Sequence, residues 1–300
     1  MNTIFWGTPD FAIPSMEKIF SSHHKIVAVV TTPDKEKGRG LKPSFSPVKE
    51  FAVQNNIPVL QPVSFKDEQF IQNLKHINAD VYVIVAFKIL PEEIFTIPQF
   101  GSFNLHGSLL PKYRGAAPIQ WAIINGEKET GVTTFKLAEK VDTGNIYLTK
   151  QIPISDSDNF GSLHDKLSVL GSEAVIETLN LIESGNYELM QQDNTLASPA
   201  PKITKELAEL SWERTAKQMR DLIRGLSPYP GAVFTHKDIT YKVFDTEVNN
   251  SMTLSQGEFY FTKDSLWIGC AEGTLKILEI QREGKKRMKI EEFLRGNKFN

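Results

Sequence analysis

An uninterrupted apolar run in the first third of the chain most constrains the fold. Residues 80 to 87, Asp-Val-Tyr-Val-Ile-Val-Ala-Phe, are rich in β-branched and aromatic side chains. Such a run is typical of a strand buried on both faces of a parallel sheet. The N-terminal segment supports the same fold, because residues 4 to 30 predict a strand, a glycine turn, a helix and a second strand. We therefore predict an α/β domain with a Rossmann-like, doubly wound, mostly parallel sheet.

The first turn of this predicted unit argues against a dinucleotide-binding site. It has the sequence Gly7-Thr-Pro9 instead of Gly-x-Gly-x-x-Gly. Pro9 also lacks the N–H group that a phosphate cradle would use. We therefore expect no nicotinamide or flavin dinucleotide at this turn.

Polar and conformationally restricted residues gather in residues 103 to 118, Phe-Asn-Leu-His-Gly-Ser-Leu-Leu-Pro-Lys-Tyr-Arg-Gly-Ala-Ala-Pro. The first three predict a short strand, and Asn104 and His106 point the same way on it because they are two apart. Gly107 ends the strand at its carboxyl end, where ligands bind in open α/β sheets. A strand-to-helix connection with a hydrogen-bonded structural histidine is the alternative. The amide and imidazole together favour a functional site.

A later turn could complete this site. Residues 131 to 137 alternate like a strand, and Val141-Asp-Thr-Gly144 follows them. Asp142 could be only a turn former, since Asp and Gly are favoured in turns. A carboxylate beside an imidazole also sets its tautomer and stabilises its cation. Asn104, His106 and Asp142 could then run an acyl-type transfer without a metal, with the amide donating to the oxyanion and the imidazole moving the proton.

Length and composition narrow the class of protein. Three hundred residues favour two domains, and a net charge of −2 gives no global signature of nucleic-acid binding. Cys270, the one cysteine, rules out an intrachain disulfide and a cysteine-based zinc site, and it fits a reducing cytoplasm. The N-terminus lacks the basic and apolar regions of a signal peptide, and no apolar stretch approaches about 18 residues. We expect a cytoplasmic monomer without a membrane span.

A proline-rich polar stretch predicts the domain organisation. We expect a catalytic domain at residues 1–189, a linker at 190–205 and a C-terminal domain at 206–300. The last of these begins with a predicted amphipathic helix at 206 to 226. Several short strand-like runs follow between 232 and 280, so we predict a small all-β domain with a leading helix.

Four motifs resemble the formyltransferases that use 10-formyltetrahydrofolate. They are Asn104-Leu-His106, Ser108-Leu-Leu-Pro111, Arg114-Gly-Ala-Ala-Pro-Ile-Gln120 and Val141-Asp-Thr-Gly144. The resemblance is fullest to the members that act on methionyl-tRNA, and it covers nearly the whole chain. It continues through residues 4–11, 32–34, 38–40, 46–49, 201–203, 228–232, 284–286 and 293–294. One departure is Phe87-Lys88, where the family usually has an aromatic-glycine pair at the lip of the folate pocket.

The resemblance implies a catalytic domain followed by a small C-terminal OB-like β-barrel domain. It implies transfer of the formyl group of 10-formyltetrahydrofolate to the amino group of initiator methionyl-tRNA, with Asn104, His106 and Asp142 as catalytic residues and no metal. The expected folate-binding residues are Ser108, Leu109, Leu110 and Pro111. Lys112 and Arg114 would hold the glutamate tail or the tRNA end.

Two basic segments are the expected tRNA contacts. Residues 31 to 49, a predicted long loop, carry five basic and two acidic side chains, and the resemblance points to Arg39 and Lys42 within them. Residues 282 to 298 carry seven basic and three acidic side chains, and Lys285 and Lys286 are the candidates there. Such charge can hold a phosphate backbone without base specificity. Either segment could equally be a solvated surface.

Other functions remain open at this point. A formyltransferase acting on an amino-sugar nucleotide or on glycinamide ribonucleotide, or a folate hydrolase, would need the same three polar residues. A non-catalytic tRNA-binding protein is a different class, and the presence of all three argues against it. Salt-sensitive binding of initiator tRNA would separate the tRNA-dependent functions from the small-substrate ones.

Overall fold

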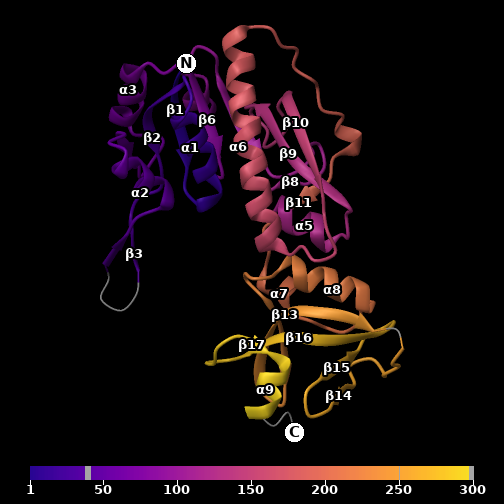
Figure 1. Cartoon of the computed structure of the whole chain (residues 1–300). Coiled ribbons are helices and arrows are strands. Elements are labelled where there is room, and N and C mark those ends of the chain that lie inside the picture. The colour runs from indigo at the N-terminus through magenta and orange to yellow at the C-terminus, as the bar shows by residue number, and fades with distance from the viewer. Residues whose placement is uncertain (38–41, 250, 297–300) are drawn as a thin grey trace. The chain divides into compact units, whose positions relative to one another are not determined.

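A seven-stranded sheet organises the first part of the chain (Figure 1). The computed structural model describes residues 1–37, 42–249 and 251–296. These divide into one unit of residues 1–115, 131–152 and 164–199, and a second unit of residues 116–130, 153–163 and 200–300. The predicted α/β fold class and the small β-rich unit that follows it are both confirmed.

The sheet of the first unit is mostly parallel, with the strand order β10-β9-β7-β6-β1-β2-β5. Its parallel strands are β1 (Asn2–Gly7), β2 (Lys25–Val30), β5 (Val59–Leu60), β6 (Val81–Val85) and β7 (Ser102–His106). Every residue of β6 is buried, as its apolar composition predicts. Beyond β7, β9 (Glu129–Lys136) runs antiparallel to it, and β10 (Ile146–Pro153) forms the edge.

Helices connect and cover these strands. The shorter ones are α1 (Ile13–Phe20), α2 (Pro47–Gln54), α3 (Glu68–Ile77) and α4 (Glu92–Phe95), with a 3-10 turn η1 (Asp10–Ala12) before α1. The long helix α6 (Phe160–Ser184) packs on the sheet, where the hydroxyls of Thr178 and Thr134 are 2.6 Å apart. Its cap is Asn159, whose side-chain oxygen accepts from the Ser162 backbone N–H at 3.0 Å.

The segment predicted as a long loop contains a hairpin instead. Strands β3 (Lys35–Lys37) and β4 (Lys42–Ser44) pair antiparallel, with Lys35 opposite Ser44. Helix α2 begins at Pro47, and the Ser46 side chain caps it by accepting from the Lys49 N–H.

The second unit is built on an antiparallel sheet with the order β12-β13-β16-β15-β14, and β17 also pairs with β16. Its strands are β12 (Ala232–His236), β13 (Ile239–Asn249), β14 (Phe259–Phe261), β15 (Leu266–Gly269), β16 (Thr274–Arg282) and β17 (Met288–Lys289). The helices are α5 (Pro118–Ile124), α7 (Lys205–Ala208), α8 (Ala216–Gly225) and α9 (Ile290–Gly296). No helix in the described ranges combines the length and apolarity that crossing a membrane requires.

The core of the second unit forms around helix α8. Trp212, Met219, Leu222 and Ile223 are all buried there. Helix α8 begins with a capping box, in which Thr215 and Gln218 each bond the other's backbone. Cys270 is buried in the same core, and burial raises the pKa of its thiol to about 11. This thiol is therefore a packing residue.

Candidate active site

Strand β7 carries two of the predicted catalytic side chains. Asn104 is half-buried and His106 is 6% exposed. Their spacing of two residues on one strand gives them the same direction. Across the described ranges, the Asn104 side-chain amide has no hydrogen-bond partner, so its N–H groups are available to a ligand.

The ring of His106 is fixed by a backbone carbonyl. Its Nε2 lies 2.8 Å from the carbonyl oxygen of Tyr113, which can only accept, so Nε2 carries a proton. The other nitrogen, Nδ1, lies 3.8 Å from Oδ2 of Asp142. A second proton on Nδ1 would make an imidazolium facing this carboxylate. The Tyr113 carbonyl therefore orients the ring, and Asp142 is placed to stabilise its cation.

Asp142 is held in a strained turn between β9 and β10. Its φ is 54°, in the left-handed region, and its Oδ2 accepts from the Gly115 N–H at 2.8 Å. Gly144 is required two residues later, because an added Cβ would lie 1.7 Å from the Lys136 carbonyl oxygen. The Val-Asp-Thr-Gly motif is thus a turn former that also brings a carboxylate to His106, so the two interpretations of the motif are compatible.

The expected folate-binding residues lie in a loop with its own hydrogen bonds. The Ser108 hydroxyl donates to the Lys112 carbonyl at 2.7 Å, and the Thr133 hydroxyl donates to the Ser108 carbonyl at 2.7 Å. Leu110 packs into a small core cluster. Leu109 and Pro111 are half-buried and keep exposed surface. Folate binding by these four residues stays a prediction, and the half-buried pair is best placed for it.

Sequence reasoning missed Gln192, which ties the Asp142 turn to the loop after β7. This buried side chain donates to the backbone carbonyls of Asp142 at 2.9 Å and Gly144 at 2.7 Å. Its oxygen accepts from Nη2 of Arg114 at 2.7 Å, and the same nitrogen donates to Asn194 at 2.8 Å. The predicted ligand role of Arg114 stays a prediction.

A second missed residue is Ser198, whose hydroxyl oxygen accepts from the Tyr113 N–H at 2.9 Å. It lies, like Gln192, in the segment that its composition predicts to be a linker. The predicted linker runs from residue 190 to 205. In the structure, its part up to residue 199 belongs to the first unit. No local pattern marks either side chain, because both contribute through contacts with backbone groups far away in the chain.

The structure describes three of the four candidate tRNA contacts. Arg39 lies outside the described residues, and Lys42 begins β4. Lys285 and Lys286 are exposed in the turn between β16 and β17, and neither has an ion-pair partner within the described ranges. The neighbouring Arg287 differs, since it pairs with Glu279 and its guanidinium lies 4.3 Å from the Phe244 ring centroid.

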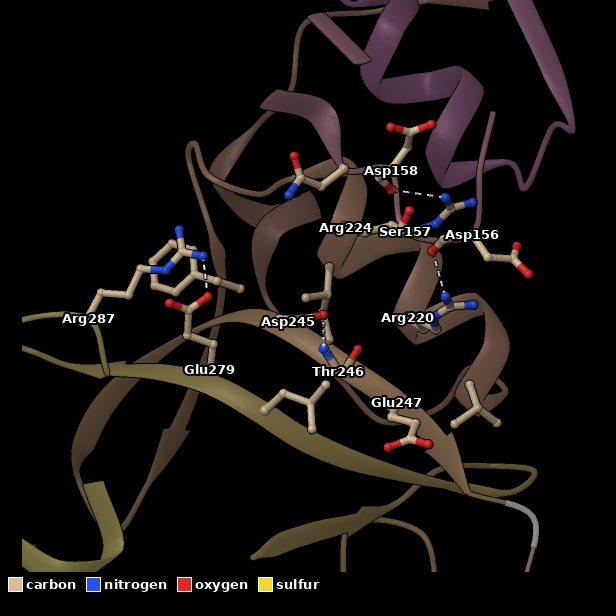
Figure 2. Close-up of a pocket in the computed structure, with 15 residues that line it drawn as sticks. Asp156, Ser157, Asp158, Arg220, Arg224, Asp245, Thr246, Glu247, Glu279 and Arg287 are labelled. Carbon is tan, nitrogen blue, oxygen red and sulfur yellow. Dashed lines mark hydrogen bonds and ion pairs between the residues drawn. The ribbon is translucent and has the colours of Figure 1, made fainter. Parts of the chain in front are cut away.

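A cavity of about 550 Å³ lies in the second unit and contains none of the predicted catalytic residues. Figure 2 shows its charged lining from residues 156–159, α8, β13 and β16. Its arginines are already bound within the chain: Arg220 donates to the Asp156 carbonyl at 2.6 Å and Arg224 to the Asp158 carbonyl at 3.1 Å. Burial raises the pKa of Asp245 in this lining.

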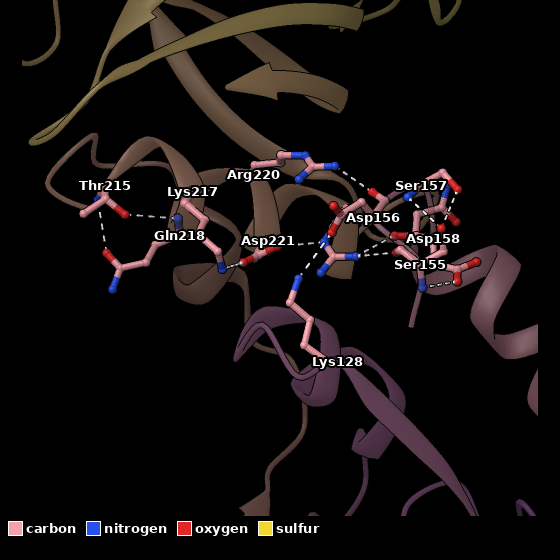
Figure 3. Close-up of polar contacts among 12 residues, drawn as sticks. Lys128, Ser155, Asp156, Ser157, Asp158, Thr215, Lys217, Gln218, Arg220 and Asp221 are labelled. Atoms are coloured by element: carbon pink, nitrogen blue, oxygen red, sulfur yellow. Dashed lines mark hydrogen bonds and ion pairs between the residues drawn. The ribbon is translucent and has the colours of Figure 1, made fainter. Parts of the chain in front are cut away.

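The same region contains an ionic network centred on buried Asp221. Its carboxylate accepts from Nε of Arg224 at 2.8 Å and from Nζ of Lys217 at 2.9 Å (Figure 3). Lys128 and Asp156, 3.4 Å apart, extend it to the solvent. Because the buried charges are paired, the cavity is best explained as part of a structural network.

Two family models match this chain. The formyl transferase model matches residues 1–179, and the formyl transferase C-terminal domain model matches residues 202–298. A methionyl-tRNA formyltransferase of Caldanaerobacter subterraneus is 47% identical over 300 residues, covering 99% of this chain and 97% of the relative. One of Clostridioides difficile is 45% identical over the same shares of both chains.

Solved structures share the fold at low sequence identity. An N-formyltransferase from Helicobacter canadensis, in complex with folinic acid and dTDP-3-aminofucose, has a TM-score of 0.70 and 20% identity, covering 93% of this chain and 98% of its own. HypX from Aquifex aeolicus in complex with tetrahydrofolic acid has a TM-score of 0.65 and 16% identity, covering 98% of this chain and 47% of its own.

Proposed function

This chain belongs to the formyl transferase family, and we propose that it transfers the formyl group of 10-formyltetrahydrofolate to the amino group of initiator methionyl-tRNA. The product would be N-formylmethionyl-tRNA for the initiation of translation. In this reaction the amine nitrogen bonds to the formyl carbon and the bond from that carbon to the folate nitrogen breaks. One proton leaves the amine and one reaches the folate nitrogen.

The observation that carries the proposed chemistry is the arrangement at the end of β7. Among the residues that the structure describes, none bonds the Asn104 amide N–H groups, and His106 two residues later faces the Asp142 carboxylate at 3.8 Å. The amide would donate to the oxyanion of the tetrahedral intermediate, where each such donor contributes roughly 10²–10³ in rate.

The proposed role of His106 is to move the proton. Because Nε2 is held by the Tyr113 carbonyl, the exchangeable position is Nδ1, on the side of Asp142. The carboxylate would stabilise the imidazolium before the proton passes to the leaving folate nitrogen. This general acid–base chemistry contributes typically about 10²–10⁴-fold.

The donor and acceptor would be held by the loop and by the basic residues. Leu109 and Pro111, with Ser108 and Leu110 shaping the loop, would line the pteridine site. Arg39, Lys42, Lys285 and Lys286 would contact tRNA phosphates, which predicts salt-dependent binding. We expect the enzyme to act as a cytoplasmic monomer, and multi-angle light scattering checks the oligomeric state.

Transfer to an amino-sugar nucleotide is the second candidate. The sugar formyltransferases share the fold with this chain at about 20% identity, whereas the methionyl-tRNA formyltransferases share 45–47% over its whole length. The basic residues and the C-terminal unit also favour a tRNA substrate.

The test is formyl transfer to charged initiator methionyl-tRNA from 10-formyltetrahydrofolate, by the wild type and by His106→Ala. We expect transfer by the wild type and a loss of at least about 10²-fold in the variant. A folded wild-type protein that binds the folate but formylates only an amino-sugar nucleotide would overturn the proposed acceptor. Equal rates in the two proteins would overturn the proposed role of His106.

A further inference from the structure

Three side chains with nitrogen or oxygen donors meet within the first unit, near the end of α6. His23 and His24 form the turn between α1 and β2, and Glu183 lies in the last turn of α6. The donor atoms of the three side chains all lie within 4.8 Å of one another. They are not part of the proposed formyl-transfer site.

The distances among these donors are close to those of a metal site. Nε2 of His23 lies 2.6 Å from Oε2 of Glu183, and Nδ1 of His24 lies 3.9 Å from Oε1 of the same carboxylate. The Met1 amine lies 3.1 Å from Nδ1 of His24 and 3.0 Å from Oε1 of Glu183. Ligands about 2.1 Å from a tetrahedral ion lie about 3.4 Å apart, so small side-chain shifts would bring the three side chains to one centre.

The tautomer of His24 supports ligation. Its Nε2 lies 3.0 Å from the side-chain oxygen of Asn180, which accepts, so Nε2 carries the proton. The lone pair is therefore on Nδ1, which faces Glu183 and the Met1 amine. A hydrogen bond from the far ring nitrogen to a fixed acceptor is how proteins commonly orient metal-binding histidines. Asn180 and Glu183 are three residues apart on α6, so one helix face supplies both the ligand and its orienting partner.

The three donors are also accessible to an ion. A cavity of about 410 Å³ opens beside the donors and is lined by Met1, His23 and Glu183 among others. The group is thus reachable from solvent, although the His24 side chain itself is fully buried.

We propose that His23, His24 and Glu183 form a binding site for a divalent transition-metal ion such as Zn²⁺. Two imidazoles and one carboxylate favour zinc and its neighbours over Mg²⁺ and Ca²⁺, which prefer all-oxygen sites. The ion would join the turn before β2 to the end of α6. Its role is structural, since the proposed formyl transfer needs no metal.

The test measures Zn²⁺ binding to the tag-free chain after EDTA treatment, at pH 8, by competition with a chromophoric zinc chelator. We expect one Zn²⁺ per chain and a thermal midpoint that rises with Zn²⁺ but not with Mg²⁺. His23→Ala and Glu183→Gln should each weaken the affinity at least tenfold. His23 is exposed, so its variant should fold. The matched control is His76→Ala, an exposed histidine on α3, which should bind like the wild type.

Two results would overturn the site. The first is no saturable Zn²⁺ binding by the wild type, and the second is the same affinity in His23→Ala, Glu183→Gln and the wild type, which would mean adventitious binding elsewhere.

Discussion

The end of β7 and the charged cavity of the second unit both concentrate polar side chains, but they use them differently. At β7, the Asn104 amide has no partner within the described ranges, and Nδ1 of His106 is 3.8 Å from Asp142, beyond hydrogen-bond distance. In the cavity, Arg224 donates to the Asp221 carboxylate and to two backbone carbonyls.

The two regions also differ in backbone conformation. Asp142 and Tyr113 both have φ near 60° at the β7 site, whereas the arginine network is anchored on the regular helix α8. Backbone strain and polar groups without partners are typical of functional sites. Polar groups that satisfy one another's hydrogen bonds are typical of structural networks. The comparison teaches that the size of a cavity is a poorer guide to chemistry here than the hydrogen bonds that a site leaves unmade.

The largest effect on activity should come from Asp142→Asn. Asparagine tolerates the left-handed backbone and can still accept from the Gly115 N–H, so the change removes mainly the charge facing His106. We expect kcat for formyl transfer to fall by about 10³-fold with little change in stability. Asp156→Asn, at an exposed carboxylate of the other region, is the control and should keep wild-type kcat. Similar rates in the two variants would remove the distinction between the regions.

The converse change is Arg224→Met, which should affect stability and not chemistry. It leaves the buried Asp221 carboxylate with Lys217 alone, whose side chain is 65% exposed. Breaking such a pair costs about 3 kcal/mol of unfolding free energy, measurable by urea denaturation. We expect kcat to stay within about twofold of wild type where the variant is folded. A large fall in kcat without loss of stability would assign chemistry to the cavity.

An intermediate effect is expected from Gln192→Met. The change removes the two hydrogen bonds that hold the Asp142 turn, while Asp142 itself remains. Because misplacing a catalytic group is costly, we expect kcat to fall about tenfold and the KM for the folate to change less. Gln72→Met, at an exposed glutamine of α3, is the matched substitution and should change neither quantity. Wild-type kcat in Gln192→Met would make this residue purely structural.

The smallest effect is a pH dependence of stability from His24 in the metal-free protein. Burial, together with the Met1 ammonium and His23, lowers its pKa, against Asn180 and Glu183, which raise it. The unfolded chain therefore binds more protons between the lowered value and about 6.5, so the contribution of His24 makes stability rise with pH across that window. When the pH falls from 7.5 to 5.5, the midpoint of urea unfolding should decrease less in His24→Gln than in the control His76→Gln. Equal losses would contradict this assignment.

Much of this arrangement follows from local sequence patterns. The apolar run of β6 and the spacing of Asn104 and His106 predict a buried strand and a shared direction, because both depend only on strand geometry. The Val-Asp-Thr-Gly motif predicts the turn that carries Asp142.

The remaining features depend on contacts between distant segments. Gln192 donates to backbone carbonyls about fifty positions earlier in the chain, and no local pattern reveals these contacts. The polar residues next to it in the sequence predict a linker instead. The hairpin at residues 35–44 depends on pairing that its charged composition does not suggest. The inward packing of Leu110 likewise depends on Phe135 and Ile146 from β9 and β10.

The most direct test of the central claim is the single-turnover rate of formyl transfer by Asn104→Ala, measured together with its urea midpoint. Because the amide has no partner within the described ranges, its loss should leave the midpoint unchanged. The account predicts a rate at least about 10²-fold below wild type, since an oxyanion donor is lost. A rate within tenfold of wild type, with the same midpoint, would contradict the claim that the uncommitted groups at the end of β7 perform the chemistry.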